Sequence, residues 1–345
     1  HGGPERDGGA GDRGRGGGTG AGAGDRRFGD GGGRFGPAAS AGHRLRGVLS
    51  LARPTVAGQL RAYLALTKPR IVELLLVTTV PTMVLAAGGL PAGGLVVATL
   101  VGGALAAGGA NAINCYLDRD IDAVMARTRD RPLVTGTVTP SRALVFALAL
   151  EVAAFALLWR TVNPLSALLA LGATAFYIGV YTVWLKRTST ANIVIGGAAG
   201  AVPVLVGWAA VRGSLDWAPL VLFGIIFLWT PPHFWALAVR YRADYAAAGI
   251  PMLPAVAGLR VTAVRILGYT VLLWALTLAL YPVAGMGTLY LVAASALGGV
   301  FTWHAVQLVR TESPAVAMRV FTWSISYLGL LFLAMALDQL VRTGI

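Results

Sequence analysis

Residues 74–117 read LLLVTTVPTMVLAAGGLPAGGLVVATLVGGALAAGGANAINCYL, and none of these residues is Asp, Glu, Lys or Arg. A helix needs about 20 apolar residues to cross the hydrocarbon core of a bilayer. Lipid offers the backbone no hydrogen-bond partner, so an apolar run that crosses it has to be helical. The stretch therefore predicts two membrane-spanning helices joined by a turn.

Runs of the same kind follow along the rest of the chain. Glu151 interrupts one of them, and Arg319 lies in the first turn of the last. The longest is expected to turn back between Pro282 and Gly287, which makes it two helices. The runs cover residues 143–159, 161–185, 188–211, 217–239, 266–309 and 315–337. Together with the first stretch they predict an all-α integral membrane protein with nine transmembrane helices.

The composition agrees with this fold class. Of the 345 residues, 56% are hydrophobic and only 12% are charged, whereas a soluble domain has about a quarter of its residues charged. An ordinary soluble enzyme is therefore excluded. The single cysteine, Cys115, excludes an intrachain disulfide and a Cys-rich metal site. The net charge of +13 comes from a tail and from one side of the membrane, so we expect no nucleic-acid partner.

Three parts are expected along the chain. Residues 1–50 are rich in Gly and Arg and cannot bury enough apolar surface to fold, so they are predicted to be a disordered tail on the cytoplasmic side. Residues 51–70 are predicted to be an interfacial segment, with a short helix at 55–66. Residues 71–345 form the nine-helix domain.

The basic residues predict the orientation of the chain. Thirteen of them lie in the loops after the second, fourth, sixth and eighth helices or at the adjoining helix ends: Arg119, Arg127, Arg129, Arg131, Arg142, Lys186, Arg187, Arg240, Arg242, Arg260, Arg265, Arg310 and Arg319. The opposite side has three: Arg160, Arg212 and Arg342. Because cytoplasmic loops carry the excess of Lys and Arg, we expect the N-terminus inside and the C-terminus outside.

Carboxylates gather at the inner end of the second helix. Asp118, Asp120, Asp122 and Asp130 lie within 13 residues there. Asn114, Asp118 and Asp122 are spaced four apart, which places them on one face of a continuous helix. Mg²⁺ takes one or two carboxylates of a protein and completes its shell with water and substrate phosphate oxygens. The spacing favours a metal–phosphate site; the alternative is a solvated loop whose acids pair with neighbouring arginines.

These residues also carry a family resemblance. Residues 114–133, NCYLDRDIDAVMARTRDRPL, resemble the first motif of the UbiA superfamily of intramembrane prenyltransferases. Three further stretches are similar to the branch of that superfamily that farnesylates protohaem IX: KRTSTANIVIGGAAGA (186–201), WTPPHFWALA (229–238) and DYAAAGIPMLP (244–254). The resemblance extends from about Lys68 to the C-terminus and leaves residues 1–50 unaccounted for.

The resemblance implies a reaction and its reactants. A farnesyl group passes from farnesyl diphosphate to a vinyl group of haem B, which gives haem O for haem–copper oxidases. The fold implied is a helix bundle around a central cavity, with Mg²⁺ held by Asn114, Asp118 and Asp122. The implied location is a bacterial plasma membrane, with the mitochondrial inner membrane as the alternative. Haem A synthase or oxidase assembly proteins are the implied protein contacts.

The basic residues beside the acidic helix end have two interpretations. Lys186 is expected to take part in catalysis, with Arg187, Arg119 and Arg127 as diphosphate or substrate ligands; alternatively, Lys186 and Arg187 anchor the helix on the positive side. Asn192 opens the next helix ahead of the small residues GGAAGA, and it is either a cap or a wall of the substrate pocket.

A second half-site is expected after the sixth helix. Pro231 and Pro232 are predicted to break that helix, and His233 is predicted to contact haem or ligate its iron, with a structural histidine as the alternative. Many members of the superfamily carry two Asp residues four apart here, but this chain has Ala248 where the partner of Asp244 would stand. Arg240 and Arg242 are therefore expected to contact phosphate or haem propionates. Asp244 either joins them or pairs with Arg240.

Two other functions remain open. A related prenyltransferase that acts on an aromatic quinone precursor or another tetrapyrrole would share the acidic face and differ near His233. An ion-coupled transporter would also have many helices and buried acids. Transporters place their site near the midplane of the membrane, whereas these charges gather at one rim, which disfavours a transporter.

Overall fold

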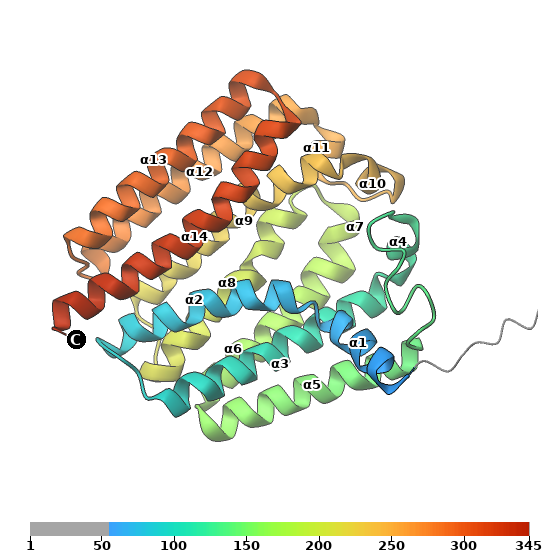
Figure 1. Cartoon of the computed structure of the whole chain (residues 1–345), viewed down its shortest axis with the longest axis horizontal. Helices are drawn as coiled ribbons and strands as arrows, with labels where there is room; N and C mark the ends of the chain where they lie inside the picture. The colour runs from blue at the N-terminus through green and yellow to red at the C-terminus, as the bar shows by residue number, and fades with distance from the viewer. Residues whose placement is uncertain (1–54, 345) are drawn as a thin grey trace, which may run out of the picture. The chain divides into compact units, whose positions relative to one another are not determined.

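The structure is a computed structural model, and it describes residues 55–344. The expected tail, residues 1–50, lies outside the described residues. Residues 55–344 contain helices and turns but no strand. The helices are α1 Val56–Thr67, α2 Pro69–Ala87, α3 Gly93–Leu117, α4 Arg119–Val124, α5 Pro140–Thr161, α6 Pro164–Ala175, η1 Phe176–Leu185, α7 Lys186–Thr188, α8 Asn192–Arg212, α9 Trp217–Arg240, α10 Arg242–Ala247, α11 Leu253–Val256, α12 Gly258–Val283, α13 Thr288–Thr311 and α14 Pro314–Thr343 (Figure 1).

The all-α membrane fold predicted from the sequence is confirmed. In the part of the chain that the structure describes, eight helical segments are long and apolar enough to cross a bilayer, and α6, η1 and α7 together make one of them. The remaining helix of the predicted nine is α2, a 19-residue helix whose apolar part is the shorter segment Val77–Ala87. The turn between α12 and α13 falls where it was expected.

Small residues let neighbouring helices approach closely. On α3, a Cβ at Gly102 would lie 2.5 Å from the side chain of Leu158 on α5, and one at Gly109 would lie 3.0 Å from the carbonyl oxygen of Ala147. Glycine at these positions removes the side chain that would hold the helices apart, as is usual in membrane bundles. α8 packs in the same way against α9, and α14 returns to pack against α2 and α9.

The sequence prediction for α9 was wrong in one respect. α9 runs unbroken from Trp217 to Arg240 and contains Pro231 and Pro232 in its interior. Both prolines are buried, and α8, α12 and α14 pack against α9. Neighbouring helices and Thr side chains can satisfy the backbone groups that a proline frees in a membrane helix. A proline pair therefore does not have to end the helix.

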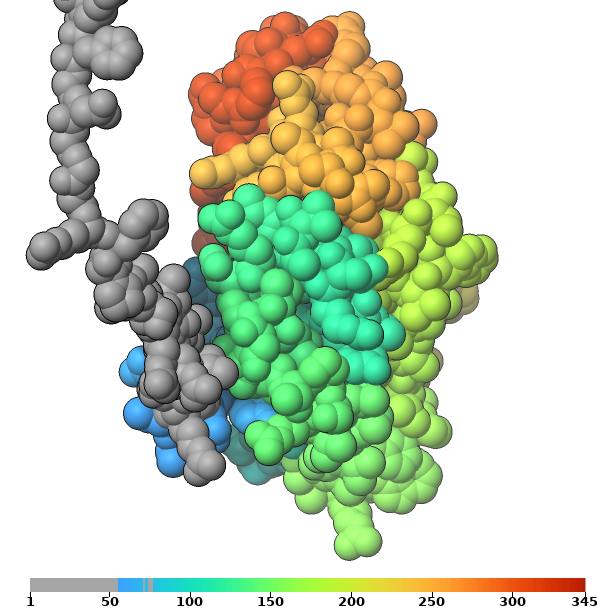
Figure 2. All heavy atoms as spheres, turned by 90° about the vertical axis from the view of Figure 1, so that its right-hand side faces the viewer, coloured from blue at the N-terminus to red at the C-terminus, as the bar shows by residue number. Residues whose placement is uncertain are grey.

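The short helices lie at one end of the long ones. Figure 1 shows α4, α7, α10 and α11 at the same end, while the C-terminus of α14 lies at the other. Figure 2 shows the segment from α4 to the start of α5 beside α10 and α11 on that end face. Segments that are far apart in the sequence thus meet around the end of α3.

Candidate active site

The acidic helix end keeps its helical spacing. α3 ends at Leu117, Asp118 is the residue between α3 and α4, and α4 begins at Arg119. The amide of Asp118 donates to the carbonyl of Asn114 at 2.9 Å, and the amide of Asp122 donates to that of Asp118 at 2.8 Å. Asn114, Asp118 and Asp122 therefore follow one another at helical intervals, and all three are buried.

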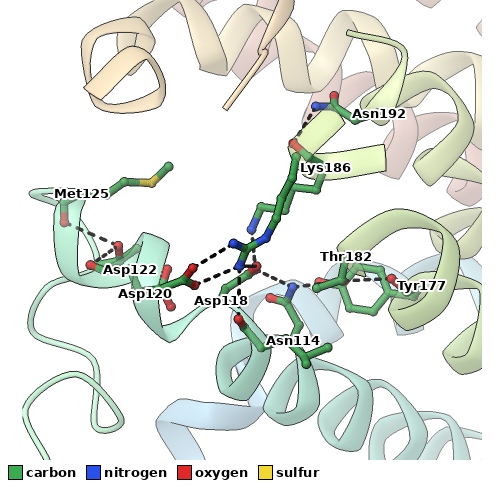
Figure 3. A network of polar contacts seen from close by, with 12 residues as sticks. Asn114, Asp118, Asp120, Asp122, Met125, Tyr177, Thr182, Lys186 and Asn192 are labelled. Carbon is green, nitrogen blue, oxygen red and sulfur yellow. Dashed lines mark hydrogen bonds and ion pairs between the residues drawn. The ribbon is translucent and has the colours of Figure 1, made fainter. Parts of the chain in front are cut away.

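Asp118 is the centre of the site. Its Oδ2 accepts a hydrogen bond from Asn114 Nδ2 at 2.7 Å and forms an ion pair with Lys186 Nζ (Figure 3). Arg187 Nη2 lies 3.8 Å from Oδ1. Within residues 55–344, Oδ1 has no hydrogen-bond partner although it is buried. A buried carboxylate oxygen without a hydrogen bond is costly, so Asp118 presents an acceptor that is ready for a ligand.

Asn114 joins three elements. Its Oδ1 accepts from Lys68 Nζ, which lies 2.8 Å away at the corner between α1 and α2. Its Nδ2 also donates to Thr182 Oγ1 on η1 at 3.1 Å, and Thr182 donates to the carbonyl of Tyr177 at 2.9 Å. Lys68 is half-buried, and the burial of its ammonium group lowers its pKa.

The other two carboxylates have their own cations. Arg131 Nη1 lies 2.6 Å from Asp122 Oδ2. Arg187 donates to both oxygens of Asp120, at 2.8 and 2.9 Å. The hydrogen bonds from Arg187 lower the pKa of Asp120 to about 2, so this pair stays ionised at neutral pH. We call the set formed by Asn114, Asp118, Asp120, Asp122, Lys68, Arg131, Lys186 and Arg187 the ionic cluster.

A π-helix brings two of these cations to α3. In η1 the hydrogen bonds skip one more residue than in an α-helix, and the amide of Lys186 donates to the carbonyl of Tyr181 at its end. Stretches of π-helix are rare and are frequent at functional sites. Thr182 and Lys186 contact Asn114 and Asp118 at the end of α3 (Figure 3). Arg187 Nη2 donates to the carbonyl of Leu117 at 3.2 Å.

An apolar cavity of about 320 Å³ lies next to the ionic cluster. Residues of α3, α6, η1, α8 and α9 line it, and most of them are Gly, Ala or Val. Asn111 lines it one helical turn before Asn114, and Tyr177 and Tyr181 line it from η1. An apolar chamber with charged side chains close by is suited to a ligand with a hydrocarbon chain and an anionic head.

Two tyrosines stand between the cavity and the charges. The rings of Tyr177 and Tyr181 are stacked, with centroids 5.5 Å apart and 12° between the planes. A Cβ on Gly196 of α8 would collide with the ring of Tyr181. Glycine at this position is therefore what lets the stacked pair lie against α8.

The donor set fits a magnesium ion only in part. Among the described residues, no group of three or more His, Cys, Asp or Glu is arranged to hold a metal. Asp118 nevertheless offers an oxygen without a hydrogen bond, and Asn114 and Asp122 add oxygens at helical spacing. Because Mg²⁺ completes a small set of protein ligands with water and phosphate oxygens, the site fits Mg²⁺ that arrives together with a phosphate ligand.

A comparison with known protein families decides where the chain belongs. Residues 75–334 match the UbiA prenyltransferase family. The chain belongs to this family. It is therefore a prenyltransferase that spans the membrane several times.

Named relatives in the UbiA family are close in sequence. The chain is 52% identical to a protein named protoheme IX farnesyltransferase from Paenarthrobacter aurescens (strain TC1), over 87% of this chain and 94% of that protein. It is 54% identical to one of the same name from Clavibacter michiganensis subsp. michiganensis, over 83% and 94% of the two chains. A third, from Frankia casuarinae, is also 54% identical, over 81% and 98%.

Solved structures share the UbiA fold. A digeranylgeranylglyceryl phosphate synthase superposes with a TM-score of 0.69 at 17% identity, over 82% of this chain and 99% of that one. A UbiA homolog from Archaeoglobus fulgidus, bound to DMAPP and Mg²⁺, superposes with a TM-score of 0.60 at 18% identity, over 79% and 98% of the two chains. At such identities the likeness shows the fold alone.

Not every residue expected in the site joins the ionic cluster. Arg119 turns back to the carbonyl of Tyr116, which it reaches at 2.7 Å. Arg127 donates to the hydroxyl of Tyr245 at 3.2 Å, so it connects the loop after α4 to α10. Asn192 is buried, and its Nδ2 donates to the carbonyl of Lys186 at 3.5 Å. Asn192 thus holds the end of η1 and does not line the cavity.

The second half-site is more dispersed. His233 Nδ1 shares a hydrogen bond of 2.7 Å with Ser324 Oγ on α14, and its ring stacks on Trp229 with centroids 4.1 Å apart. His233 does not line the cavity; Thr230 and Phe234, on another face of α9, do. Within the described residues no ion pair joins Arg240 to Asp244, and Arg242 is exposed.

Sequence reasoning missed Lys68, Asn111 and Thr182. Asn111 carried a usable signal, because it lies three residues before Asn114 and so on the same side of α3. Lys68 carried a weaker one, since it is a lone lysine directly before a proline at the start of an apolar helix. Thr182 carried none, because its position depends on the π-helical turn.

Proposed function

We propose that this prenyltransferase transfers a farnesyl group from farnesyl diphosphate to a vinyl group of haem B and so forms haem O. Relatives more than half identical to the chain, over more than four fifths of its length, are named protoheme IX farnesyltransferase. The observation that carries the proposal is an apolar cavity beside a buried ionic cluster, since Asn111 lines the cavity one helical turn before Asn114. These two parts match the diphosphate and the hydrocarbon chain of farnesyl diphosphate.

Asn114, Asp118 and Asp122 would hold Mg²⁺ together with diphosphate oxygens. Two observations support this assignment: Oδ1 of Asp118 is buried without a hydrogen bond, and the UbiA homolog from Archaeoglobus fulgidus was bound to DMAPP and Mg²⁺. When bound, Mg²⁺ would neutralise charge on the diphosphate oxygens.

Lys186 and Arg187 act on the leaving group. Their cations lie against Asp118, within reach of a diphosphate that binds beside this carboxylate. When the bond between the first carbon of the farnesyl chain and the diphosphate oxygen breaks, the electron pair stays with the diphosphate. Fixed cations in a water-poor site stabilise that growing negative charge more than water does.

The cavity protects the allylic cation that ionisation leaves behind. Its wall is apolar, and the stacked rings of Tyr177 and Tyr181 lie between it and the charges. Ring faces stabilise a nearby cation. The vinyl group supplies its π electrons to form the new carbon–carbon bond. Water then adds to the resulting carbocation and loses a proton, which gives the hydroxyethylfarnesyl side chain.

The acceptor is assigned to the region after α9. His233 serves haem in this proposal, with Arg240, Arg242 and Asp244 beside its propionates, and Arg119 and Arg127 border the same end face. The bacterial plasma membrane is the proposed location. Haem A synthase or oxidase assembly proteins are the proposed neighbours that would receive the product.

Product analysis tests the proposal. Purified full-length protein is incubated with haem B, farnesyl diphosphate and MgCl₂, and the haem fraction is analysed by mass spectrometry. We expect a haem heavier by one farnesyl group plus one hydroxyl group. A parallel reaction replaces haem B with 4-hydroxybenzoate as an aromatic quinone precursor. If 4-hydroxybenzoate were prenylated and haem B left unchanged, the assignment of haem as the acceptor would be overturned, while the assignment as a prenyltransferase would stand.

A further inference from the structure

Three side chains of α3 hold the corner at which α1 turns into α2. Each contacts one of three consecutive residues at the end of α1. Cys115 Sγ donates to the carbonyl of Leu66 at 3.9 Å, Asn111 Nδ2 donates to that of Thr67 at 3.1 Å, and Asn114 Oδ1 accepts from Lys68 Nζ at 2.8 Å. The corner is thus fixed against the helix that carries the ionic cluster.

Lys68 occupies a costly backbone conformation. Its φ of 52° and ψ of 60° lie in the left-handed region, which side chains other than glycine rarely adopt. It also precedes Pro69, which restricts it further. Within residues 55–344, the only other non-glycine residue with positive φ is Glu312, at the end of α13. Such strain persists where the surroundings impose it and where function gains from it.

Lys68 also differs from the other cations of the ionic cluster. Lys186, Arg187 and Arg131 each lie against a carboxylate. Lys68 makes no ion pair within the described residues, and its one hydrogen bond goes to a neutral amide oxygen. An ammonium group has three donors, so two of them are unused. A half-buried cation with spare donors beside Asn114 is suited to an anionic ligand.

We propose that Lys68 is a diphosphate-binding residue, which the α1–α2 corner contributes to the ionic cluster. It donates to a diphosphate oxygen while Asn114 holds its side chain in place. The proposal rests on the proposed function, since it assigns Lys68 to the same diphosphate site. Asn111 acts as a positioning residue, because it fixes the carbonyl before Lys68 and touches no charge itself.

Calorimetry tests the proposal with inorganic pyrophosphate and MgCl₂ as the probe. Full-length protein in detergent is compared with Lys68→Met, which keeps the length of the side chain and removes its charge. A hydrogen bond to a charged group accounts for roughly a ten- to hundredfold change in affinity. We therefore expect Lys68→Met to bind pyrophosphate at least tenfold more weakly, and Lys68→Arg to recover most of that loss.

Two glycine variants separate binding from backbone strain. Lys68→Gly and Glu312→Gly both relieve a positive φ. We expect both to be at least as stable as the parent in thermal unfolding, and only Lys68→Gly to lose pyrophosphate affinity. If Lys68→Met and Lys68→Gly bound pyrophosphate as the parent does, Lys68 would be structural and our inference would be overturned. If the parent itself bound no pyrophosphate, the proposed function would fail instead.

Discussion

At the scale of single residues, the ionic cluster gives each of its three carboxylates a cation and leaves Lys68 without an ion pair among the described residues. Asp118 and Asp120 pair with the consecutive residues Lys186 and Arg187, and Asp122 pairs with Arg131. A bound metal and diphosphate change this arrangement, because the metal attracts the carboxylates and the diphosphate attracts the cations. The carboxylates and cations of the site can therefore exchange their ion-pair partners when the metal and the diphosphate bind.

Replacing Asp118 or Asp122 with Asn should abolish turnover. Each substitution keeps the shape of the side chain but removes the charge that a metal requires. We expect at least a hundredfold loss of product in the mass-spectrometric assay, with the protein still inserted and folded by size-exclusion chromatography. Asp130→Asn is the matched control, since Asp130 is exposed in the same loop and should leave turnover unchanged. Near-normal activity of either site variant would rule out the metal-ligand assignment.

Mg²⁺ and diphosphate should bind together. Lys186 already pairs with Asp118, and the described residues hold no three-carboxylate group. We expect Mg²⁺ alone to bind weakly in calorimetry and at least tenfold more tightly in the presence of pyrophosphate. EDTA should stop turnover, and added Mg²⁺ should restore it. Tight binding of Mg²⁺ without pyrophosphate would contradict this coupling.

His233 and Asp118 should serve different ligands. His233→Ala should weaken haem binding, followed by absorbance, while pyrophosphate binding stays normal; Asp118→Asn should do the reverse. The reason is that His233 contacts Ser324 and Trp229 on the α14 side of α9, apart from the ionic cluster. If His233→Ala bound both ligands normally, this histidine would only pack α9 against α14. If both variants lost binding of the same ligand, His233 and Asp118 would not serve different ligands.

The acidic half of the cluster could be predicted from the sequence, but its cations could not all be predicted. Asn114, Asp118 and Asp122 lie four residues apart, so helical geometry alone places them together. Lys68 reaches Asn114 only because α1 and α2 meet at a corner held by α3. No periodicity in the sequence encodes that contact between residues 46 positions apart.

At the scale of helices, sequence reasoning succeeded where length and apolarity decide the outcome. The turn after Pro282 and the start of α8 at Asn192 were both anticipated. It failed at Pro231 and Pro232, where tertiary packing keeps α9 whole. It also missed η1, because a π-helix and an α-helix have the same apolar composition and differ in their hydrogen bonds.

Asp338 should stabilise the start of α13. Its carboxylate accepts from the amides of Gly287 at 2.6 Å and Tyr290 at 3.0 Å, so α14 caps a neighbouring helix. Removing a capping side chain costs about 1–2 kcal/mol. We expect Asp338→Ala to lower the free energy of unfolding by that amount, measured by reversible denaturation in detergent. Asp216→Ala is the control, because Asp216 precedes α9 without a capping hydrogen bond. An equal loss in both variants would contradict the capping role.

At the scale of the whole molecule, the site lies where two environments meet. The ionic cluster is at the end of the bundle that carries α4, α7, α10 and α11 (Figure 1), while the cavity extends among apolar helices. Farnesyl diphosphate has a charged head and a lipid-soluble tail, and haem is largely apolar. A site at the membrane rim can receive both without drawing either fully into water.

The orientation of the chain in the membrane is the last prediction. Thirteen basic residues at the end that carries the ionic cluster, against three at the other, predict that this end faces the cytoplasm. With nine crossings, the C-terminus then lies outside. The single cysteine, Cys115, is buried, so an introduced cysteine can be labelled selectively. We expect a membrane-impermeant maleimide to label Thr343→Cys on intact cells, and to label Arg129→Cys only after lysis. The reverse pattern would overturn the orientation. Labelling of both variants from the same side would mean that one of the seven apolar helical segments between the two positions does not cross the bilayer.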